Sequence, residues 1–261
     1  METKDNLWVT LAQVDLTWED PQKNRLDLEI LIRQLKGKSD LIILPETFTT
    51  GFSMHANDLA EPMDGSTITW MRNVSNTTGL AICGSLLIKE RELCYNRCVF
   101  IKPDGAISFY DKRHLFSIGG ESSKIVPGDK RLIVSFMGWR IALYTCYDIR
   151  FPVWCRNRND TDLMIFTANW PASRQEVWKI LLKARAIENQ VYVAGVNRIG
   201  TDGNGILYAG ESQMVSSKGE VMTETGETRN GLFTYEISKK ELFDFRIKFP
   251  VSNDADKFLI I

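Results

Sequence analysis

The chain has 261 residues, of which 44% are hydrophobic and 25% charged, and its formal net charge at pH 7 is −1. This composition is that of an ordinary globular protein with a sizeable core, and the length suits one large α/β domain or two small ones. A charge so close to zero gives no reason to expect nucleic acid or an anionic membrane as a partner. A small molecule or another protein is left as the partner.

The N-terminus and the cysteines both bear on location. Residues 1–6 are charged, and the apolar stretch after them is too short for a signal peptide or a transmembrane helix, so we expect a cytoplasmic protein. The five cysteines are an odd number without the spacing of a disulfide framework, which fits a reducing compartment. Cys83, Cys94 and Cys98 include no C-x-x-C pair and have no histidine nearby, so we expect no metal site.

The first half of the chain opens with a strand and then a helix. Asp20 followed by Pro21 predicts the start of a helix over 22–35, and the continuous apolar run 41–44 is typical of a central strand covered on both faces. Ser66 is expected to cap a helix that reaches about Thr78. The remaining strands of this half are predicted at 7–12, 80–88, 93–101 and 106–110.

The second half begins with residues 112–129, which have no sustained period; an irregular stretch of that length is usually functional. Strands are predicted at 133–136, 139–145, 163–167, 191–197, 213–216 and 232–237, and a short helix at 153–158. A strongly periodic helix over 175–189 is predicted to have one apolar face made of Val177, Ile180, Leu181, Ala184 and Ile187. We predict one domain over 1–261, with a tail from about residue 239 that packs on the surface or on a partner.

Cys146 stands where the strand 139–145 ends and a turn-prone segment begins. A cysteine in that place meets backbone N–H groups and the positive end of a helix dipole, and both favour the thiolate, which is the nucleophile. The alternative is a core cysteine with no chemical role.

Two further reactive side chains also stand at strand ends. Glu46 follows the strand 41–44 and Lys112 follows the strand 106–110, so a base, a cation and a nucleophile occupy equivalent positions with Cys146. Open α/β sheets present their ligand crevice at strand ends. The alternatives are a cap or surface carboxylate for Glu46 and a solvated lysine for Lys112.

These residues carry a family resemblance. The segments 44–46, 111–116 and 146–152 resemble, in order, the three signature segments of the nitrilase (carbon–nitrogen hydrolase) superfamily, and segments 168–171 and 185–189 match as well. The resemblance covers roughly residues 7–236 and is greatest to the bacterial ω-amidase branch. It implies a four-layer α-β-β-α sandwich, a Glu46-Lys112-Cys146 triad with Glu121 as a second carboxylate, no metal or other cofactor, and amide rather than nitrile hydrolysis.

The residue chemistry gives each group a role. Cys146 would attack the amide carbonyl, and Glu46 would accept its proton and later pass it to ammonia. Lys112 and the backbone N–H of Tyr147 would stabilise the oxyanion, and water would hydrolyse the thioester. The resemblance implies that Glu121 helps to position the substrate and the lysine; the alternative is a loop carboxylate bonded to nearby backbone.

Arg150 follows the nucleophile by four residues, and a guanidinium is suited to hold a substrate carboxylate. An ion pair with Asp148 or Glu188 is the alternative. Phe52, Phe116 and Trp170 are predicted as apolar walls of the pocket, with core packing as the alternative. By resemblance, the substrates are small carboxylated amides: ω-amides of dicarboxylic acids, above all keto amides such as α-ketoglutaramate or its methionine-derived counterpart.

Three matters stay open at this level. Another hydrolase of the superfamily, such as an N-carbamoyl amino acid amidohydrolase or a nitrilase, would use the same triad, as would an acyl-transferring relative. A nonhydrolytic binding protein of the same fold is a further alternative. The resemblance also implies a homodimer, which the composition does not show independently.

Overall fold

The computed structural model describes residues 3–222 and 228–260. Its strands are β1 (Asn6–Gln13), β2 (Leu41–Ile43), β3 (Ala81–Glu90), β4 (Leu93–Ile101), β5 (Ile107–Asp111), β6 (Ile133–Phe136), β7 (Trp139–Thr145), β8 (Leu163–Ala168), β9 (Tyr192–Asn197), β10 (Ile199–Thr201), β11 (Leu207–Ala209), β12 (Gln213–Val215) and β13 (Gly231–Ser238). Its α-helices are α1 (Pro21–Arg33), α2 (Ala56–Leu59), α3 (Ser66–Thr78), α4 (Gln175–Asn189) and α5 (Lys239–Lys248).

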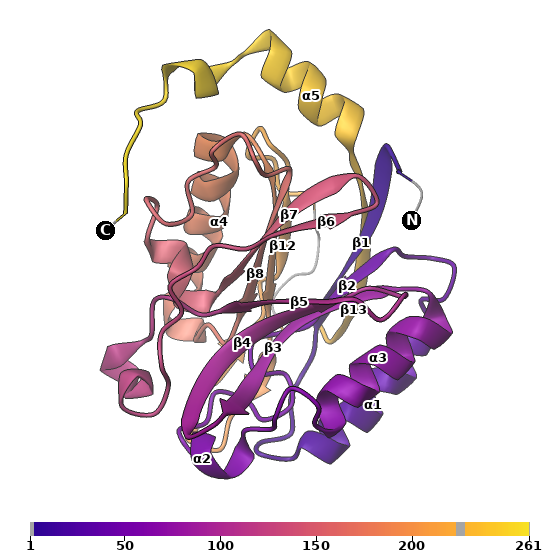
Figure 1. Cartoon of the computed structure of the whole chain (residues 1–261), viewed down its shortest axis with the longest axis vertical. Helices are drawn as coiled ribbons and strands as arrows, with labels where there is room; N and C mark the ends of the chain where they lie inside the picture. The colour runs from indigo at the N-terminus through magenta and orange to yellow at the C-terminus, as the bar shows by residue number, and fades with distance from the viewer. Residues whose placement is uncertain (1–2, 223–227, 261) are drawn as a thin grey trace.

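The strands form two large sheets that pack face to face. One has the order β13-β1-β2-β3-β4-β5 and the other the order β12-β9-β8-β7-β6, while β10 and β11 form a separate small hairpin. Helices α1 and α3 lie together outside the first sheet, and α4 lies outside the second (Figure 1). This confirms the predicted four-layer α-β-β-α sandwich.

The run 41–44, which contains β2 and the residue after it, is apolar at every position because both of its faces are covered. Leu41 and Ile43 belong to the core between the two sheets, whereas Ile42 and Leu44 belong to the core under α1 and α3. Because successive side chains of a strand point to opposite faces, a strand with helices on one side and a sheet on the other needs apolar residues at every position.

The start of α3 differs from the prediction. Gly65, not Ser66, is the N-cap, and a glycine has no side chain with which to bond to the first turn of the helix. Instead the carboxylate of Glu61 accepts hydrogen bonds from the backbone N–H of Thr67 at 2.8 Å and from the hydroxyl of Ser66 at 3.0 Å. A residue outside the helix therefore satisfies its first donors.

The predicted extent of α4 is confirmed, but the predicted apolar face is not the fully buried one, since Val177 and Leu181 are only partly buried against the core. The buried residues are Trp178, Leu182, Arg185, Ala186 and Asn189. Ile180 and Ile187 are instead 62% and 54% exposed. Trp178 and Leu182 pack tightly against Gly195 of β9, and the buried guanidinium of Arg185 donates to the carbonyl of Ile149 at 2.6 and 2.9 Å. These contacts fix the rotation of the helix and leave an apolar stripe outside.

Two other predictions of secondary structure need correction. Residues 153–158 form no helix; a 3₁₀ helix over Cys146–Arg150 comes first, followed by a turn. The tail predicted from residue 239 begins as the helix α5, capped by Ser238, whose hydroxyl accepts from the backbone N–H of Glu241. Only Leu242 of α5 is buried, so the helix lacks the apolar periodicity that would reveal it in the sequence.

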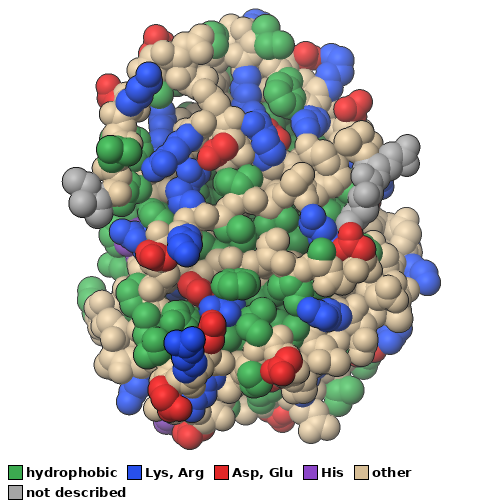
Figure 2. Space-filling view, viewed as in Figure 1, with side chains coloured by type: hydrophobic (Ala, Val, Ile, Leu, Met, Phe, Trp, Pro, Cys, Tyr) green, Lys and Arg blue, Asp and Glu red, His purple; other side chains and the backbone are tan. Residues whose placement is uncertain are grey.

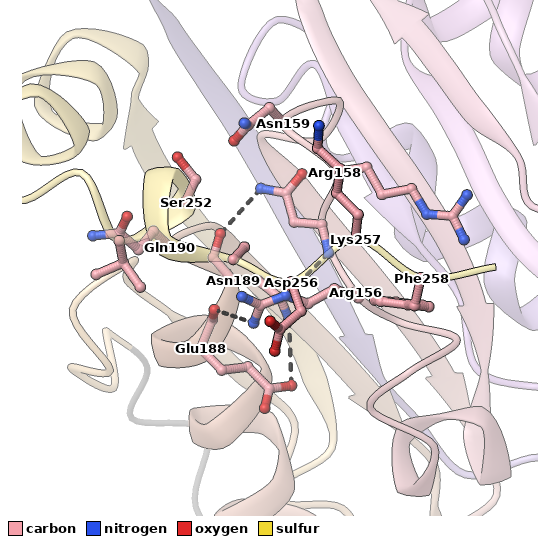
Figure 3. Close-up of a pocket in the computed structure, with 13 residues that line it drawn as sticks. Arg156, Arg158, Asn159, Glu188, Asn189, Gln190, Ser252, Asp256, Lys257 and Phe258 are labelled. Atoms are coloured by element: carbon pink, nitrogen blue, oxygen red, sulfur yellow. Dashed lines mark hydrogen bonds between the residues drawn. The ribbon is translucent and has the colours of Figure 1, made fainter. Parts of the chain in front are cut away.

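An ionic contact holds α5 on its own chain. Arg246 donates to Asp162 at 3.0 Å and to the carbonyls of Thr161 and Gln190 at 2.7 and 2.9 Å. The buried Asp162 also binds Arg140 at 2.6 Å. Lys and Arg side chains gather on this face of the protein below the C-terminal segment (Figure 2). Further on, residues 251–258 lie over 156–159 and 188–190 and enclose a cavity of about 320 Å³ (Figure 3).

We predict that Asp162→Asn weakens this part of the fold in a pH-dependent way. Burial raises the pKa of Asp162, but the bonds and charges of Arg140 and Arg246 outweigh burial and hold it below its ordinary value. The carboxylate therefore stabilises the protein above about pH 4, and this stabilisation is lost as pH falls further. Urea unfolding at pH 7 should show a loss of about 3 kcal/mol in the free energy of unfolding.

The control is Asp244→Asn, since Asp244 is exposed and its salt bridge is with the exposed Lys240. It should change the free energy of unfolding by well under about 1 kcal/mol. A loss in Asp162→Asn that is equally large at pH 7 and pH 3 would show that its charge is not the stabilising feature.

Candidate active site

The structure brings the ammonium of Lys112 between two buried carboxylates. Its Nζ lies 2.9 Å from Oε1 of Glu46 and 2.8 and 3.0 Å from the two oxygens of Glu121. All three side chains are almost completely buried. Burial alone would lower the pKa of Lys112, but the charges of Glu121 and Glu46 outweigh it and hold that pKa above its ordinary value. The lysine is therefore charged and serves as a donor, not as a base.

Glu121 combines the two interpretations that its sequence allowed. Gly120 adopts a left-handed conformation, with φ of 83°, and a short 3₁₀ turn over Glu121–Ser123 follows it. The carboxylate accepts from Lys112 and also, at 2.6 Å, from the backbone N–H of Phe116. One side chain thus holds both the ammonium and the loop that bears Phe116.

Two asparagines complete the cluster, and the sequence reasoning assigned them no role. Nδ2 of Asn96 donates to Glu46 at 2.8 Å and to Glu121 at 3.1 Å. The backbone N–H of Asn169 donates to Oε2 of Glu46 at 2.8 Å, and its side chain donates to the carbonyl of Glu46 at 2.7 Å. Asn96 is buried in β4 beside the equally buried Arg97, and nothing in the sequence of that strand marks it as a residue of the site.

Cys146 lies at the end of β7 in a left-handed conformation, with φ of 46°. Non-glycine residues rarely adopt it, and such strain concentrates at functional sites. The turn is held by Asp148, whose carboxylate accepts from the backbone N–H of Thr145 at 3.0 Å and from the hydroxyl of Tyr110 at 2.7 Å. His114 also binds Asp148, at 2.8 Å, so this histidine braces the turn.

The expectation of a resting thiolate is wrong. Burial, together with the charge of Glu46, raises the pKa of Cys146 well above its ordinary value, and the opposing charge of Lys112 does not compensate. The helix that follows is a single 3₁₀ segment of five residues, too short to supply a large dipole. The surroundings of the sulfur therefore favour the thiol over the thiolate.

A cavity of about 680 Å³ opens above Cys146 and Lys112. All five residues predicted to bind substrate line it: Phe52, Phe116, Tyr147, Arg150 and Trp170. The sequence reasoning missed the other large or polar lining residues, namely Met54, Ile118, Asn169, Ser173, Arg174, Asn204, Ile206 and Tyr208. The smaller cavity of Figure 3 contains none of the predicted site residues.

Arg150 does not brace the turn. Its guanidinium lies 5.1 Å from the centre of the Trp170 ring. Asp148 is occupied by Tyr110, His114 and Thr145, and Glu188 binds Arg185. The alternative of an ion pair is therefore wrong for the part of the chain that the structure describes.

Two features are absent from residues 3–222 and 228–260. No group of three or more His, Cys, Asp or Glu side chains there is arranged to hold a metal ion. No helix there is both long and apolar enough to cross a membrane.

Comparison with known proteins agrees with this geometry. The family model for carbon–nitrogen hydrolases matches residues 8–246. The chain is 43% identical to the ω-amidase YafV of Yersinia enterocolitica, over 98% of this chain and 99% of that protein. It is 30% identical to the 2-oxoglutaramate amidase of Bacillus subtilis, over 96% of this chain and 98% of that protein.

Solved structures give the same result. The crystal structure of XC1258 from Xanthomonas campestris, a carbon–nitrogen hydrolase superfamily protein with an arsenic adduct in its active site, is 44% identical. It superposes with a TM-score of 0.96 over 98% of this chain and 100% of that one. Nit3 of Saccharomyces cerevisiae, at 24% identity and a TM-score of 0.86 over 96% of this chain and 97% of that one, shows the shared fold.

The protein is a hydrolase that acts on amides. The chain belongs to the carbon–nitrogen hydrolase (nitrilase) superfamily, and its relatives place it on the ω-amidase branch.

We predict that Asn96→Ala reduces amide hydrolysis by an effect on kcat. Without the Nδ2 donor, the carboxylates of Glu46 and Glu121 lose the side chain that bridges them directly, and kcat should fall up to about 100-fold as their positions around Lys112 loosen. The matched control is Asn24→Ala, since Asn24 is buried and bonded to the backbone of Thr17 and Thr49, outside the site. Steady-state kinetics and thermal unfolding of both variants are the measurements. An equal fall in kcat for both would reduce Asn96 to a general stabilising residue.

Proposed function

We propose that the protein hydrolyses the terminal amide of small ω-amidated dicarboxylic acids through a thioester on Cys146, with release of ammonia. Substrates of this kind are α-ketoglutaramate and the related methionine-derived keto amide. The observation that carries the proposal is the Lys112 ammonium fixed between Glu46 and Glu121 at the base of the cavity that Cys146 lines. Relatives named ω-amidase and 2-oxoglutaramate amidase support the substrate class.

The first half of the reaction forms the thioester. Sγ of Cys146 attacks the amide carbon as its proton moves to Glu46, so that the thiolate need not exist beforehand. The carbonyl oxygen becomes an oxyanion, which Lys112 and the backbone N–H of Tyr147 stabilise. As the first turn of a helix leaves its N–H groups without intrahelical partners, that of Tyr147 is suited to the task. Glu46 then passes its proton to the amide nitrogen, the C–N bond breaks and ammonia leaves.

The second half returns the free enzyme. Glu46, now a carboxylate again, takes a proton from water, and the hydroxide attacks the thioester carbon. The C–S bond breaks, the sulfur regains a proton through Glu46, and the carboxylic acid is released. Water is therefore the acyl acceptor, and the same two donors stabilise the second oxyanion.

The residues that line the upper part of the cavity would recognise the rest of the substrate. Arg150 is exposed there beside Trp170, and it provides a guanidinium for the carboxylate at the far end of the substrate. Phe52, Phe116 and Trp170 surround the methylene chain.

The test of this chemistry is mass spectrometry of the protein mixed with a carboxylated amide, with and without hydroxylamine. The wild-type protein should show an acyl adduct on Cys146 and should form a hydroxamate. Lys112→Met should show no adduct, because the oxyanion loses its cation. His114→Ala should still acylate, since its ring binds Asp148 and not the reacting atoms. Loss of the adduct in His114→Ala with an intact fold would favour a Cys-His mechanism instead.

We further propose a cytoplasmic homodimer. The supporting observations are the five cysteines, all of them free, and the outer face of α4, where Ile180 and Ile187 are exposed. Val153, which is 56% exposed, is a third large apolar side chain in this part of the protein. A second copy of the chain would cover this surface.

We predict that the double variant Ile180→Asp with Ile187→Asp is monomeric, because the charges would be buried without partners in the interface. Its molar mass, measured by light scattering after size-exclusion chromatography, should be half that of the wild type. The control is Ile30→Asp on α1, a single isoleucine with 64% exposure on the opposite side of the sandwich. A wild-type protein that is itself monomeric at high concentration would contradict the proposal.

A further inference from the structure

The mouth of the active-site cavity contains a second guanidinium besides Arg150. Arg174 lines the cavity, and its guanidinium lies 5.4 Å from the centre of the Phe116 ring. Its backbone is fixed as well, because its carbonyl accepts a hydrogen bond from Nε1 of Trp170 at 2.8 Å. The two arginines thus lie on different aromatic walls, Arg150 on Trp170 and Arg174 on Phe116.

Neither guanidinium is neutralised by a carboxylate in the part of the chain that the structure describes. The salt bridges found there involve neither Arg150 nor Arg174, and the residues that line the cavity include no Asp or Glu. A guanidinium that lies over an aromatic ring keeps N–H groups at its edge for a ligand. The mouth is therefore a site with two positive charges and free donors.

The base of the cavity has the opposite character. There the single ammonium of Lys112 faces the two carboxylates of Glu46 and Glu121. A substrate with a carboxylate at one end and a neutral amide at the other is oriented by this difference. Its carboxylate is attracted to the mouth and repelled from the base, so that the amide enters toward Cys146.

We propose that Arg174 is a specificity-determining residue which, with Arg150, selects amides that have a free carboxylate and no ammonium group beside it. An α-amino acid amide would bring its ammonium group to two guanidinium groups and no carboxylate, whereas a keto oxygen in that place can accept a hydrogen bond from either. This rests on the proposed function, because it assigns the selectivity of the same site.

The experiment compares two substrates, the monoamide of a five-carbon dicarboxylic acid and the methyl ester of that monoamide, which lacks the charge. In Arg174→Gln, kcat/KM for the acid should fall about 10- to 100-fold through KM. For the ester, kcat/KM should stay within about threefold. Arg174→Glu should reverse the preference. The control is Arg229→Gln, another guanidinium over a ring, that of Phe233, but outside the cavity.

A binding measurement separates this inference from the proposed function. Titration calorimetry with the unamidated five-carbon dicarboxylate should give a Kd about 10- to 100-fold higher for Arg174→Gln than for the wild type. Equal Kd values, or an equal loss of kcat/KM for acid and ester, would overturn the role of Arg174. If the wild type binds the dicarboxylate through Arg174 but hydrolyses neither amide, the proposed function fails and the inference stands.

Discussion

The arrangement of this protein depends on one buried ammonium. Lys112 is almost completely buried, so its charge would be very costly without the carboxylates of Glu46 and Glu121. Those carboxylates in turn need donors beyond the lysine, which Asn96 and the backbone of Asn169 and Phe116 provide. Glu46 follows β2 of the first sheet and Asn169 follows β8 of the second. The charge cluster therefore also ties the two sheets together at the edge where the cavity opens.

The same cluster also affects the protonation of Cys146. Burial away from water and the negative charge of its carboxylates both disfavour the thiolate, and together they raise the pKa of Cys146. A cysteine held as a thiol reacts slowly with stray electrophiles and oxidants, because the thiolate is the reactive form. The charge of Glu46 contributes to the raised pKa of Cys146, and the opposing charge of Lys112 does not offset it. In the proposed mechanism the same carboxylate of Glu46 is the base that removes the thiol proton.

Much of this could be predicted from the sequence, because strand ends are visible as the points where apolar runs stop. Glu46, Lys112 and Cys146 all follow such runs, and the structure brings the three together. The extent of α4 was also predictable from its periodicity, but its rotation was not. A helix with apolar residues on two faces gives no indication of which face is buried until Gly195 is known to admit Trp178. The partners of the carboxylates, Asn96 above all, come from distant strands and are identified by geometry alone.

The distribution of charge along the cavity suits the proposed selection of one kind of amide by a fold that many hydrolases share. The groups proposed to break the bond lie at the base and are bound to one another, so they leave no spare charge to recognise the rest of a substrate. In this proposal recognition depends on the mouth, where Arg150 and Arg174 lie on Trp170 and Phe116 and have no carboxylate partner among the residues described. The proposal therefore implies that substitutions at the mouth change which amide is accepted without disturbing the bonds around Lys112. It assigns bond cleavage to the base of the cavity and selectivity to its mouth, and a substrate long enough to reach both would connect them.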